Sequence, residues 1–401
     1  MAKSNGAKRI VRSAARKTVR KASKSGTGIL ILVAVVVLII GALIALYMMG
    51  YLKIPGLNAP AEPGKAETET KVTPVVVYDS EDLVITFMEL GNWYTGDCTF
   101  IKAGDCDILI DAGSRENSVP FLKAEIDKYC TDGKLEYVIV THAHQDHIAG
   151  FAPASTTKDG IFDLYECGMI IDFALTNATS KVYESYCREL QDEINAGAKH
   201  MTAREVRESG EYVFTLSEGI TMTILDNYYY YNETKDENDY SVCCLINQGG
   251  DRNFLFTGDL EEKGEAHLVE MNDLPKVNLF KGGHHGSYTA NTEKLLSVIR
   301  PDIVCICCCA FNNEYTKDET RMFPAQDSID RIAKYTDRVY VTTVSTDNEN
   351  KTFQSLNGTI HVISKPKTDI EVQCTGEQAK LKDTTWFKTY RTLPEEWKDA
   401  A

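Results

Sequence analysis

The sequence predicts an α/β layered domain, with helices outside two sheets, preceded by a single transmembrane helix. Two groups of short β-branched or apolar runs, each followed by helical patterns, predict the layers. An uncharged apolar run of 21 residues near the N-terminus predicts the membrane helix. The 401 residues are 43% hydrophobic and 25% charged, which is ordinary for a globular fold of one large or two modest domains.

The N-terminal part of the chain differs in charge from the remainder. Residues 1–53 contain ten Lys or Arg and no acid, which leaves 33 basic against 58 acidic side chains for the remainder, a formal charge of −25. Residues 1–28 are predicted to be a basic leader beside anionic headgroups, and residues 29–52 a transmembrane anchor. Residues 53–74, rich in Pro, Gly, Ala and Glu, are typical of a flexible stalk.

The charges before the apolar run predict its orientation in the cell membrane. Lys and Arg before a span favour a cytoplasmic N-terminus, so we expect the acidic domain to be extracytoplasmic. A cleaved signal peptide is the alternative, but its apolar region would be shorter, about 7–15 residues. The retained anchor is therefore favoured, with membrane lipid as the partner of residues 29–52.

The folded region is expected over residues 75–366, with residues 367–401 as a C-terminal appendage. Twelve cysteines occur in the chain, and the densest run is VCICCCA at residues 304–310. Neighbouring strand residues point to opposite faces, so this run predicts a buried strand of free thiols that pack as small apolar side chains.

The apolar runs and helical patterns predict the order of the elements. In the first half, strands are expected at residues 82–90, 99–103, 106–113 and 135–144, and helices at 119–130 and 181–197. In the second half, strands are expected at residues 211–216, 220–226, 240–247, 253–259, 277–283, 302–309 and 338–344, and helices at 262–271, 291–300 and 325–336.

The motif THAHQDHIAG, residues 141–150, follows directly on an apolar strand. It contains three of the chain's eight histidines, together with Asp146. Imidazole nitrogens and a carboxylate suit zinc and neighbouring transition metals. His142 and His144 could hold one ion, and Asp146 and His147 a second. A surface loop that is rich in histidine by chance is the alternative, and this density disfavours it.

Three further strand ends supply candidate polar groups. Asp259 follows NFLFTG, His284 and His285 follow VNLFKGG, and Asp111 follows CDILI. Asp111 is expected to orient the histidine loop rather than to bind metal, with an ordinary turn residue as the alternative.

The motif order LIDAG, THAHQDH, TGD and GGHHGS resembles the metallo-β-lactamase superfamily. More narrowly, it is similar to the branch that contains the C-terminal domain of ComEC-type DNA-uptake competence proteins and the phosphorylcholine esterases of bacterial surfaces. The segments GNWYTGDCTFIKAG and GSYTANTEKLLSVIRPDIV also resemble that branch. The resemblance covers roughly residues 82–345.

This resemblance implies a four-layer αβ/βα sandwich with two divalent ions at one sheet edge; zinc is favoured, and manganese is the alternative. It implies that Asp259 bridges both ions. One residue of the pair His284 and His285 is a ligand, and its neighbour is a supporting group or proton donor. The candidate catalytic residues are Asp146, His284 and His285, and the candidate metal ligands are His142, His144, Asp146, His147, Asp259, His284 and His285.

The sequence departs from the superfamily pattern at two places. Many members add a third histidine to the first ion, and His200 is the only histidine in the corresponding interval. The competence branch often has a late His-Pro pair, whereas the comparable place here reads MFPAQD, with Phe323. His267 and His361 fall in a predicted helix and a predicted strand, and we do not assign them to the site.

The predicted activity is hydrolysis by a hydroxide shared between two divalent ions. A bound metal lowers the pKa of water from about 15.7 to about 7, and paired ions lie about 3.5–4 Å apart. Asp259 would keep the ions at that separation, and Ser287 or a displaced histidine would protonate the leaving group.

Phosphodiesters are the expected substrates, because two cations suit an anionic transition state. A domain at −25 repels long nucleic acid, so a small-molecule or cell-surface phosphodiester is favoured over duplex DNA, although Lys281 precedes the histidine pair. The alternatives are a lactam, lactone or thioester hydrolase, and a non-catalytic metal-binding receptor or competence-associated protein. The tyrosines of residues 227–240 could face a quaternary ammonium, but packing is favoured.

Overall fold

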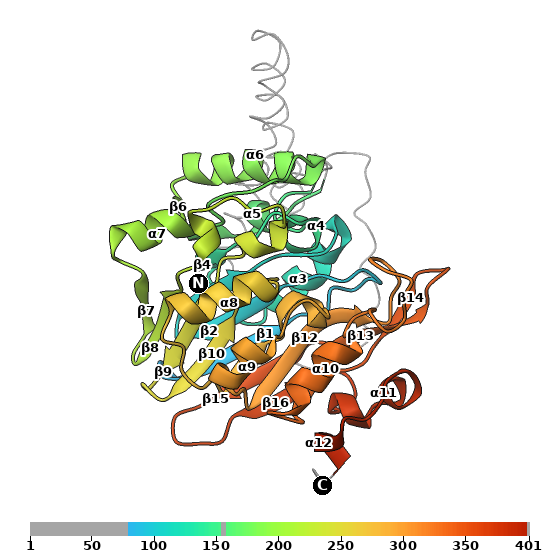
Figure 1. Ribbon diagram of the computed structural model, residues 1–401. Coiled ribbons are helices and arrows are strands. Elements are labelled where there is room, and N and C mark those ends of the chain that lie inside the picture. The colour runs from blue at the N-terminus through green and yellow to red at the C-terminus, as the bar shows by residue number, and fades with distance from the viewer. Residues whose placement is uncertain (1–78, 154–157, 399–401) are drawn as a thin grey trace, which may run out of the picture. The chain divides into compact units, whose positions relative to one another are not determined.

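Two mixed β-sheets of eight strands each form the centre of the molecule (Figure 1). The computed structural model describes residues 79–153 and 158–398. These residues belong to one unit, Val77–Ala401. The predicted leader, transmembrane anchor and stalk lie outside the described residues. Within the described ranges, no helix is both long enough and apolar enough to cross a bilayer.

The first sheet has the strand order β16-β15-β1-β2-β3-β4-β5-β6. Neighbouring strands pair antiparallel from β16 to β3 and parallel from β3 to β6. Its strands are β1 Leu83–Phe87, β2 Thr99–Ala103, β3 Cys106–Ile110, β4 Lys134–Ile139, β5 Glu166–Asp172, β6 Lys199–Thr202, β15 Ile360–Ser364 and β16 Glu371–Cys374.

The second sheet has the order β14-β13-β12-β11-β10-β9-β8-β7. Its strands pair parallel from β13 to β10, and antiparallel at both ends. They are β7 Val213–Ser217, β8 Ile220–Ile224, β9 Cys244–Gln248, β10 Arg252–Phe256, β11 Leu279–Lys281, β12 Ile303–Ala310, β13 Val339–Asp347 and β14 Thr352–Ser355.

Helices connect the parallel strands of both sheets, because a parallel pair needs a crossover connection. Figure 1 shows α8, α9 and α10 over the strands of the second sheet. The α-helices are α3 Val119–Ile126, α4 Gln145–Ile148, α5 Ile161–Leu164, α6 Lys181–Asn195, α7 Ala203–Ser209, α8 Glu262–Met271, α9 Glu293–Ile299, α10 Gln326–Ala333, α11 Thr385–Tyr390 and α12 Glu395–Lys398.

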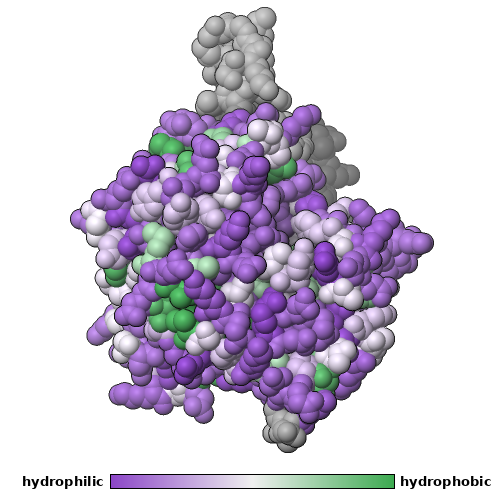
Figure 2. Space-filling model, viewed as in Figure 1, coloured by the Kyte–Doolittle hydropathy of each residue, from purple (hydrophilic) through white to green (hydrophobic). Residues whose placement is uncertain are grey.

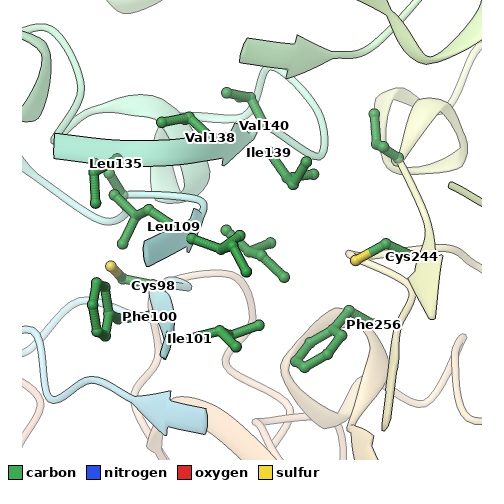
Figure 3. Close-up of a cluster of buried hydrophobic side chains, with 14 of the residues drawn as sticks. Cys98, Phe100, Ile101, Leu109, Leu135, Val138, Ile139, Val140, Cys244 and Phe256 are labelled. Atoms are coloured by element: carbon green, nitrogen blue, oxygen red, sulfur yellow. The ribbon is translucent and has the colours of Figure 1, made fainter. Parts of the chain in front are cut away.

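Alternate residues of each central strand pack on opposite faces of the sheets. In β10, Phe254 and Phe256 belong to the core that joins the two sheets, whereas Leu255 packs with the side chains of α8 and α9. Figure 3 shows Cys244 and Phe256 of the second sheet pointing toward the side chains of the first. The predicted α/β sandwich, with two sheets inside and helices outside, is therefore confirmed.

The cysteine-rich run forms β12, and every residue of that strand is buried. Cys305 and Cys307 pack in the core between the sheets, and Cys308 packs on the helix side. All twelve cysteines are free thiols; ten of them are buried, Cys374 is partly buried and Cys187 is exposed. Burial raises the pKa of Cys305 and Cys307 well above the usual value, so these thiols stay protonated at neutral pH.

The segment after residue 366 adds a strand to the first sheet and packs two helices against the second. Strand β16 pairs with β15 at the edge of the first sheet. Trp386, Phe387 and Trp397, from α11 and α12, pack in the core cluster on the helix side of the second sheet.

Figure 2 shows that the face of the molecule in this view is largely hydrophilic, with hydrophobic residues in small patches.

Candidate metal centre

The site lies where strands of both sheets end. Strands β3 and β4 are parallel, as are β10 and β11, so the carboxyl ends of each pair meet at one edge. Asp111 follows β3, the histidine loop of residues 141–147 follows β4, Asp259 follows β10, and His285 follows β11. The fold thus brings together loops that are far apart in sequence.

Four buried side chains form the centre of this site. Asp97, His147, Asp259 and His285 each offer one ligand atom, and these atoms all lie within 4.8 Å of one another. Nε2 of His147 lies 3.0 Å from Oδ2 of Asp259, and Nε2 of His285 lies 3.1 Å from the same oxygen. Two imidazoles and two carboxylates are a donor set that suits zinc or manganese.

Asp146 adjoins this cluster. Its Oδ2 lies 3.3 Å from Nε2 of His285 and accepts a hydrogen bond of 2.6 Å from the hydroxyl of Tyr315. Burial raises the pKa of Asp146, but the hydrogen bond from His285 and the charges of His147 and His285 outweigh it, so the pKa lies well below its usual value. Asp146 is therefore ionised and faces the cluster. The sequence predicts it as a metal ligand.

His142 and His144 form a neighbouring pair on the same loop. Nε2 of His142 faces Nδ1 of His144 at 3.0 Å, and the ring centroids of His142 and His147 are 4.1 Å apart. Burial lowers the pKa of His142 well below its usual value, so the ring is neutral, the form in which imidazole binds a metal. The structure thus places a candidate pair of ligands for a second ion beside the first.

Asp111 holds the ring of His147 in place, as expected for an orienting residue. Its Oδ2 accepts a hydrogen bond of 2.7 Å from Nδ1 of His147, and its two oxygens also accept from the N–H and the hydroxyl of Thr141, both at 2.8 Å. A proton fixed on Nδ1 leaves Nε2 of His147 free for a metal. Asp111 adopts a left-handed conformation with φ 57°, which Asp tolerates better than most residues.

Replacing Asp111 with Asn is expected to weaken zinc binding by about 10–100-fold, the usual cost of losing such a partner. The amide cannot keep the negative charge that favours a proton on Nδ1 of His147. Competition titration with a chromogenic chelator measures the affinity. Asp105→Asn, at an exposed position, is the control. Unchanged affinity in Asp111→Asn would show that Asp111 does not act through His147.

The structure places His284 and His285 in different surroundings. Nδ1 of His285 donates to the carbonyl of Cys307 at 2.9 Å, which directs Nε2 into the cluster. This buried Nε2 lies 3.1 Å from Oδ2 of Asp259 and 3.3 Å from Oδ2 of Asp146, so it faces the carboxylates of the cluster. His284 turns away, is partly exposed, and its Nδ1 lies 3.2 Å from Oε1 of Glu261.

The backbone of the histidine pair is strained and is held by buried side chains. His284 and His285 both have positive φ, 45° and 53°. Asn291 accepts from the N–H of Gly283 at 2.8 Å and donates to its carbonyl at 3.0 Å. The N–H of Asn291 in turn donates to Glu265 at 2.7 Å. Glu265 therefore supports the loop that carries the proposed ligand.

Glu265→Gln is expected to flatten the pH dependence of the free energy of unfolding. Burial raises the pKa of Glu265 to about 7, despite the hydrogen bonds from residues 291 and 292. A raised folded-state pKa means that this group's contribution to stability is full below about pH 4 and is lost as the pH rises through about 7. Urea unfolding at pH 5 and pH 8 should show the parent losing stability relative to the variant. Glu262→Gln, exposed on the same helix, is the control, and parallel profiles would contradict the assignment.

Asp97 and Lys281 are members of the site that the sequence did not assign. The ammonium of Lys281 is buried, pairs with Oδ2 of Asp97, and lies 3.3 Å from Oδ1 of Asp259. Oδ1 of Asp97 lies 3.3 Å from Nδ1 of His285. The Gly-Asp of GNWYTGDC and the lysine before GGHH were available as sequence clues.

The charges in the cluster stabilise one another. Burial lowers the pKa of His147, but Asp259 and Asp111 outweigh it and raise the pKa well above its usual value; Asp259 and Asp97 do the same for His285. Burial raises the pKa of Asp259, yet His147, His285 and Lys281 hold it well below its usual value. A divalent ion would replace these protons on the histidines, so metal binding should release them.

The structure also places the two residues at which the sequence departs from the superfamily pattern. His200 is in β6, and its Nε2 pairs with Asp172 at 2.8 Å. Phe323 stands beside the site, with its ring centroid 5.6 Å from that of His285.

The tyrosines of residues 227–240 mostly pack. Tyr229 and Tyr230 are buried, and Tyr228 stacks on His267 with ring centroids 4.3 Å apart.

Comparison with known proteins finds a family match and two curated relatives. Residues 91–158 match the metallo-beta-lactamase superfamily. The chain is 33% identical over 112 residues to Recombination protein 2 of Haemophilus influenzae, a match that covers 28% of this chain and 13% of that protein. It is 23% identical over 202 residues to ComE operon protein 3 of Bacillus subtilis, covering 49% of this chain and 22% of that protein. The resemblance to the superfamily and to its competence-protein branch is therefore confirmed.

The matched relatives are much longer than the region they share with this chain. The chain spans 13% of the first relative's length and 22% of the second's. Among solved structures, the metallo-beta-lactamase fold protein YhfI from Bacillus subtilis matches with a TM-score of 0.38 and 11% identity, covering 65% of this chain and 96% of that chain.

Proposed function

We propose that this protein is a membrane-anchored, metal-dependent hydrolase that cleaves small or cell-surface phosphodiesters at the Asp/His site. The observation that carries the proposal is the buried cluster of Asp97, His147, Asp259 and His285, whose donor atoms face one another. The superfamily match supports metal-dependent hydrolysis as the class of reaction. His142, His144 and Asp146 are the proposed additional ligands.

Bound divalent ions would lower the pKa of water to about 7 and stabilise an anionic transition state. The residues of this chain prepare the site for that chemistry. His147 and Asp259 would bind through the atoms that now face each other, and Asp111 keeps the His147 ring correctly turned. Nδ1 of His285, bound to the carbonyl of Cys307, keeps Nε2 available.

His284 is the proposed proton donor to the leaving group. Its Nδ1 faces Glu261, which leaves Nε2 as the atom that can give a proton to a departing oxygen. Burial raises the pKa of Glu261, but hydrogen bonds with His284, Asp236 and Thr289 outweigh this and hold the pKa at about 2, so this carboxylate is ionised beside His284. The partial exposure of His284 is consistent with a position at the mouth of the site.

The charges around the site favour a small substrate over long nucleic acid. Lys281 and Arg115 are both paired with carboxylates: Lys281 with Asp97, and Arg115 with Glu314 at 2.6 Å. Binding of long nucleic acid generally needs lysine and arginine free to neutralise phosphates. This arrangement supports a substrate with one or few phosphates.

A substrate panel tests the proposal. The full chain is incubated with zinc or manganese and with bis-p-nitrophenyl phosphate, nitrocefin or a p-nitrophenyl thioester. We expect diester hydrolysis that a chelator abolishes and added metal restores. Hydrolysis of nitrocefin or the thioester alone would overturn the substrate class. Bound metal with no turnover of any substrate would favour the non-catalytic receptor.

We propose that residues 29–52 anchor the protein in the cell membrane, with the N-terminus cytoplasmic and the hydrolase domain extracytoplasmic. The proposal rests on the length of the apolar run and on the basic residues before it. Protease added to intact spheroplasts should digest the domain. A domain that is digested only after lysis would reverse the orientation.

A further inference from the structure

We infer that the C-terminal segment, residues 381–398, positions one wall of the site. Its residues Arg391 and Tyr390 hold the loop of residues 311–324 against the proposed ligands. We call residues 311–324 the site loop. The effect on turnover rests on the proposed function, whereas the effect on the site loop does not.

The site loop contacts the metal centre from both halves of the sandwich. The hydroxyl of Tyr315 donates to Asp146, on the histidine loop of the first sheet, at 2.6 Å. The ring of Phe323 lies 5.6 Å from that of His285 and 5.7 Å from that of His284, on the loop of the second sheet. This loop therefore forms one wall of the site.

Three consecutive backbone carbonyls of the site loop are bound at its base. Nη2 of Arg391 donates to the carbonyl of Met322 at 2.8 Å, and Nε donates to the carbonyl of Pro324 at 3.0 Å. The carbonyl between them, of Phe323, accepts from the N–H of Phe311 at 2.8 Å. One guanidinium thus fixes the backbone on both sides of the ring that faces the histidines.

The next residue joins this base to the histidine pair. The N–H of Ala325 donates to the carbonyl of Gly286 at 2.8 Å. A shift of the backbone at residues 322–324 would therefore reach the loop of His285 within a few residues. The planar fork of arginine suits two carbonyls in this way, whereas a lysine ammonium can satisfy only part of the arrangement.

The C-terminal segment is itself firmly held. Trp386, Phe387 and Trp397 are buried in the core cluster of the second sheet. The ring of Tyr390 stacks on that of Phe311, at the start of the site loop, with centroids 4.3 Å apart. The segment can therefore act as a fixed support for both ends of the loop.

Hydrogen exchange measured by mass spectrometry tests the inference on the full chain. In Arg391→Ala we expect amides of residues 311–324 to exchange at least about tenfold faster, while peptides of β4 and α6 keep their parental rates. Tyr390→Ala should show the same local pattern more weakly, and Arg391→Lys should lie between Arg391→Ala and the parent. Lys388→Ala is the matched control, because this exposed cation donates to the carbonyl of Asp383 within its own segment.

Turnover and zinc content supply the second measurement. In Arg391→Ala, kcat/KM for bis-p-nitrophenyl phosphate should fall about 10–100-fold, since a misplacement of about 1 Å can cost that much. Bound zinc per chain should stay at the parental value. Partial recovery in Arg391→Lys would separate positioning from a loss of folding.

The outcomes are distinguishable from those of the proposed function. Parental exchange at residues 311–324 in both Arg391→Ala and Tyr390→Ala would overturn the inference, and so would faster exchange spread evenly over the domain in Tyr390→Ala. An active Arg391→Ala with the parental kcat/KM would also overturn it. Local loosening in a protein that hydrolyses no substrate would uphold the support role and refute the hydrolase.

Discussion

Replacing Asp259 with asparagine is expected to reduce hydrolysis by about a thousandfold or more and to remove most of the bound metal. Asp259 is almost fully buried, and its Oδ2 lies within 3.1 Å of Nε2 of both His147 and His285. Asparagine keeps the shape but loses the charge that draws a cation between the two rings. Turnover of the diester and metal content by mass spectrometry measure the two effects.

The fold should survive this change. The backbone N–H of residue 259 donates to the hydroxyl of Ser241 at 3.0 Å, and Lys281 keeps its partner Asp97. Circular dichroism should therefore match the parent. Asp273→Asn, at an exposed position, is the control for a charge change outside the site. Parental turnover in Asp259→Asn would refute its role as a ligand.

Lys281→Met is expected to lower the free energy of unfolding of the metal-free protein by about 3–5 kcal/mol, the usual cost of removing one partner of a buried ion pair. The variant leaves Asp97 and Asp259 without their ammonium in a buried site. Zinc would then supply the missing positive charge. We therefore expect zinc to raise the unfolding temperature more in Lys281→Met than in the parent.

An exposed ion pair provides the control for Lys281→Met. Lys276 pairs with Asp302 at 2.7 Å, and its side chain is 61% exposed. Lys276→Met should change the free energy of unfolding by about 1 kcal/mol or less, because solvent screens such pairs. Equal effects of the two variants would show that the buried ammonium does not stabilise the cluster.

The sequence predicted that the site loops come together, because each loop directly follows an apolar run that local sequence pattern marks as a strand. Apolar runs that end in Asp111, His142 and Asp259 are strand ends, and parallel strands bring their ends to one edge. Some strands were not predicted: the interior strand β5 and the edge strands β6, β14 and β16 were missed, whereas the edge strand β7 was predicted. Strand β6 has no fully buried residue, and its four residues lack the apolar run that marks the central strands.

Other members of the site depend on contacts between distant segments. Tyr315 bonds to Asp146, which lies 169 residues away along the chain. Arg391 bonds to Met322, which lies 69 residues away. No local pattern marks such pairs. The positions of His284 and His285 depend on the backbone angles of a strained turn: the ring of His285 is buried and that of His284 is partly exposed.

Anomalous diffraction from crystals grown with zinc tests the central claim most directly. We expect a zinc peak about 2.0–2.2 Å from Nε2 of both His147 and His285, with Asp259 beside it. A protein that binds its zinc only elsewhere, with these three side chains still paired to one another, would contradict the account.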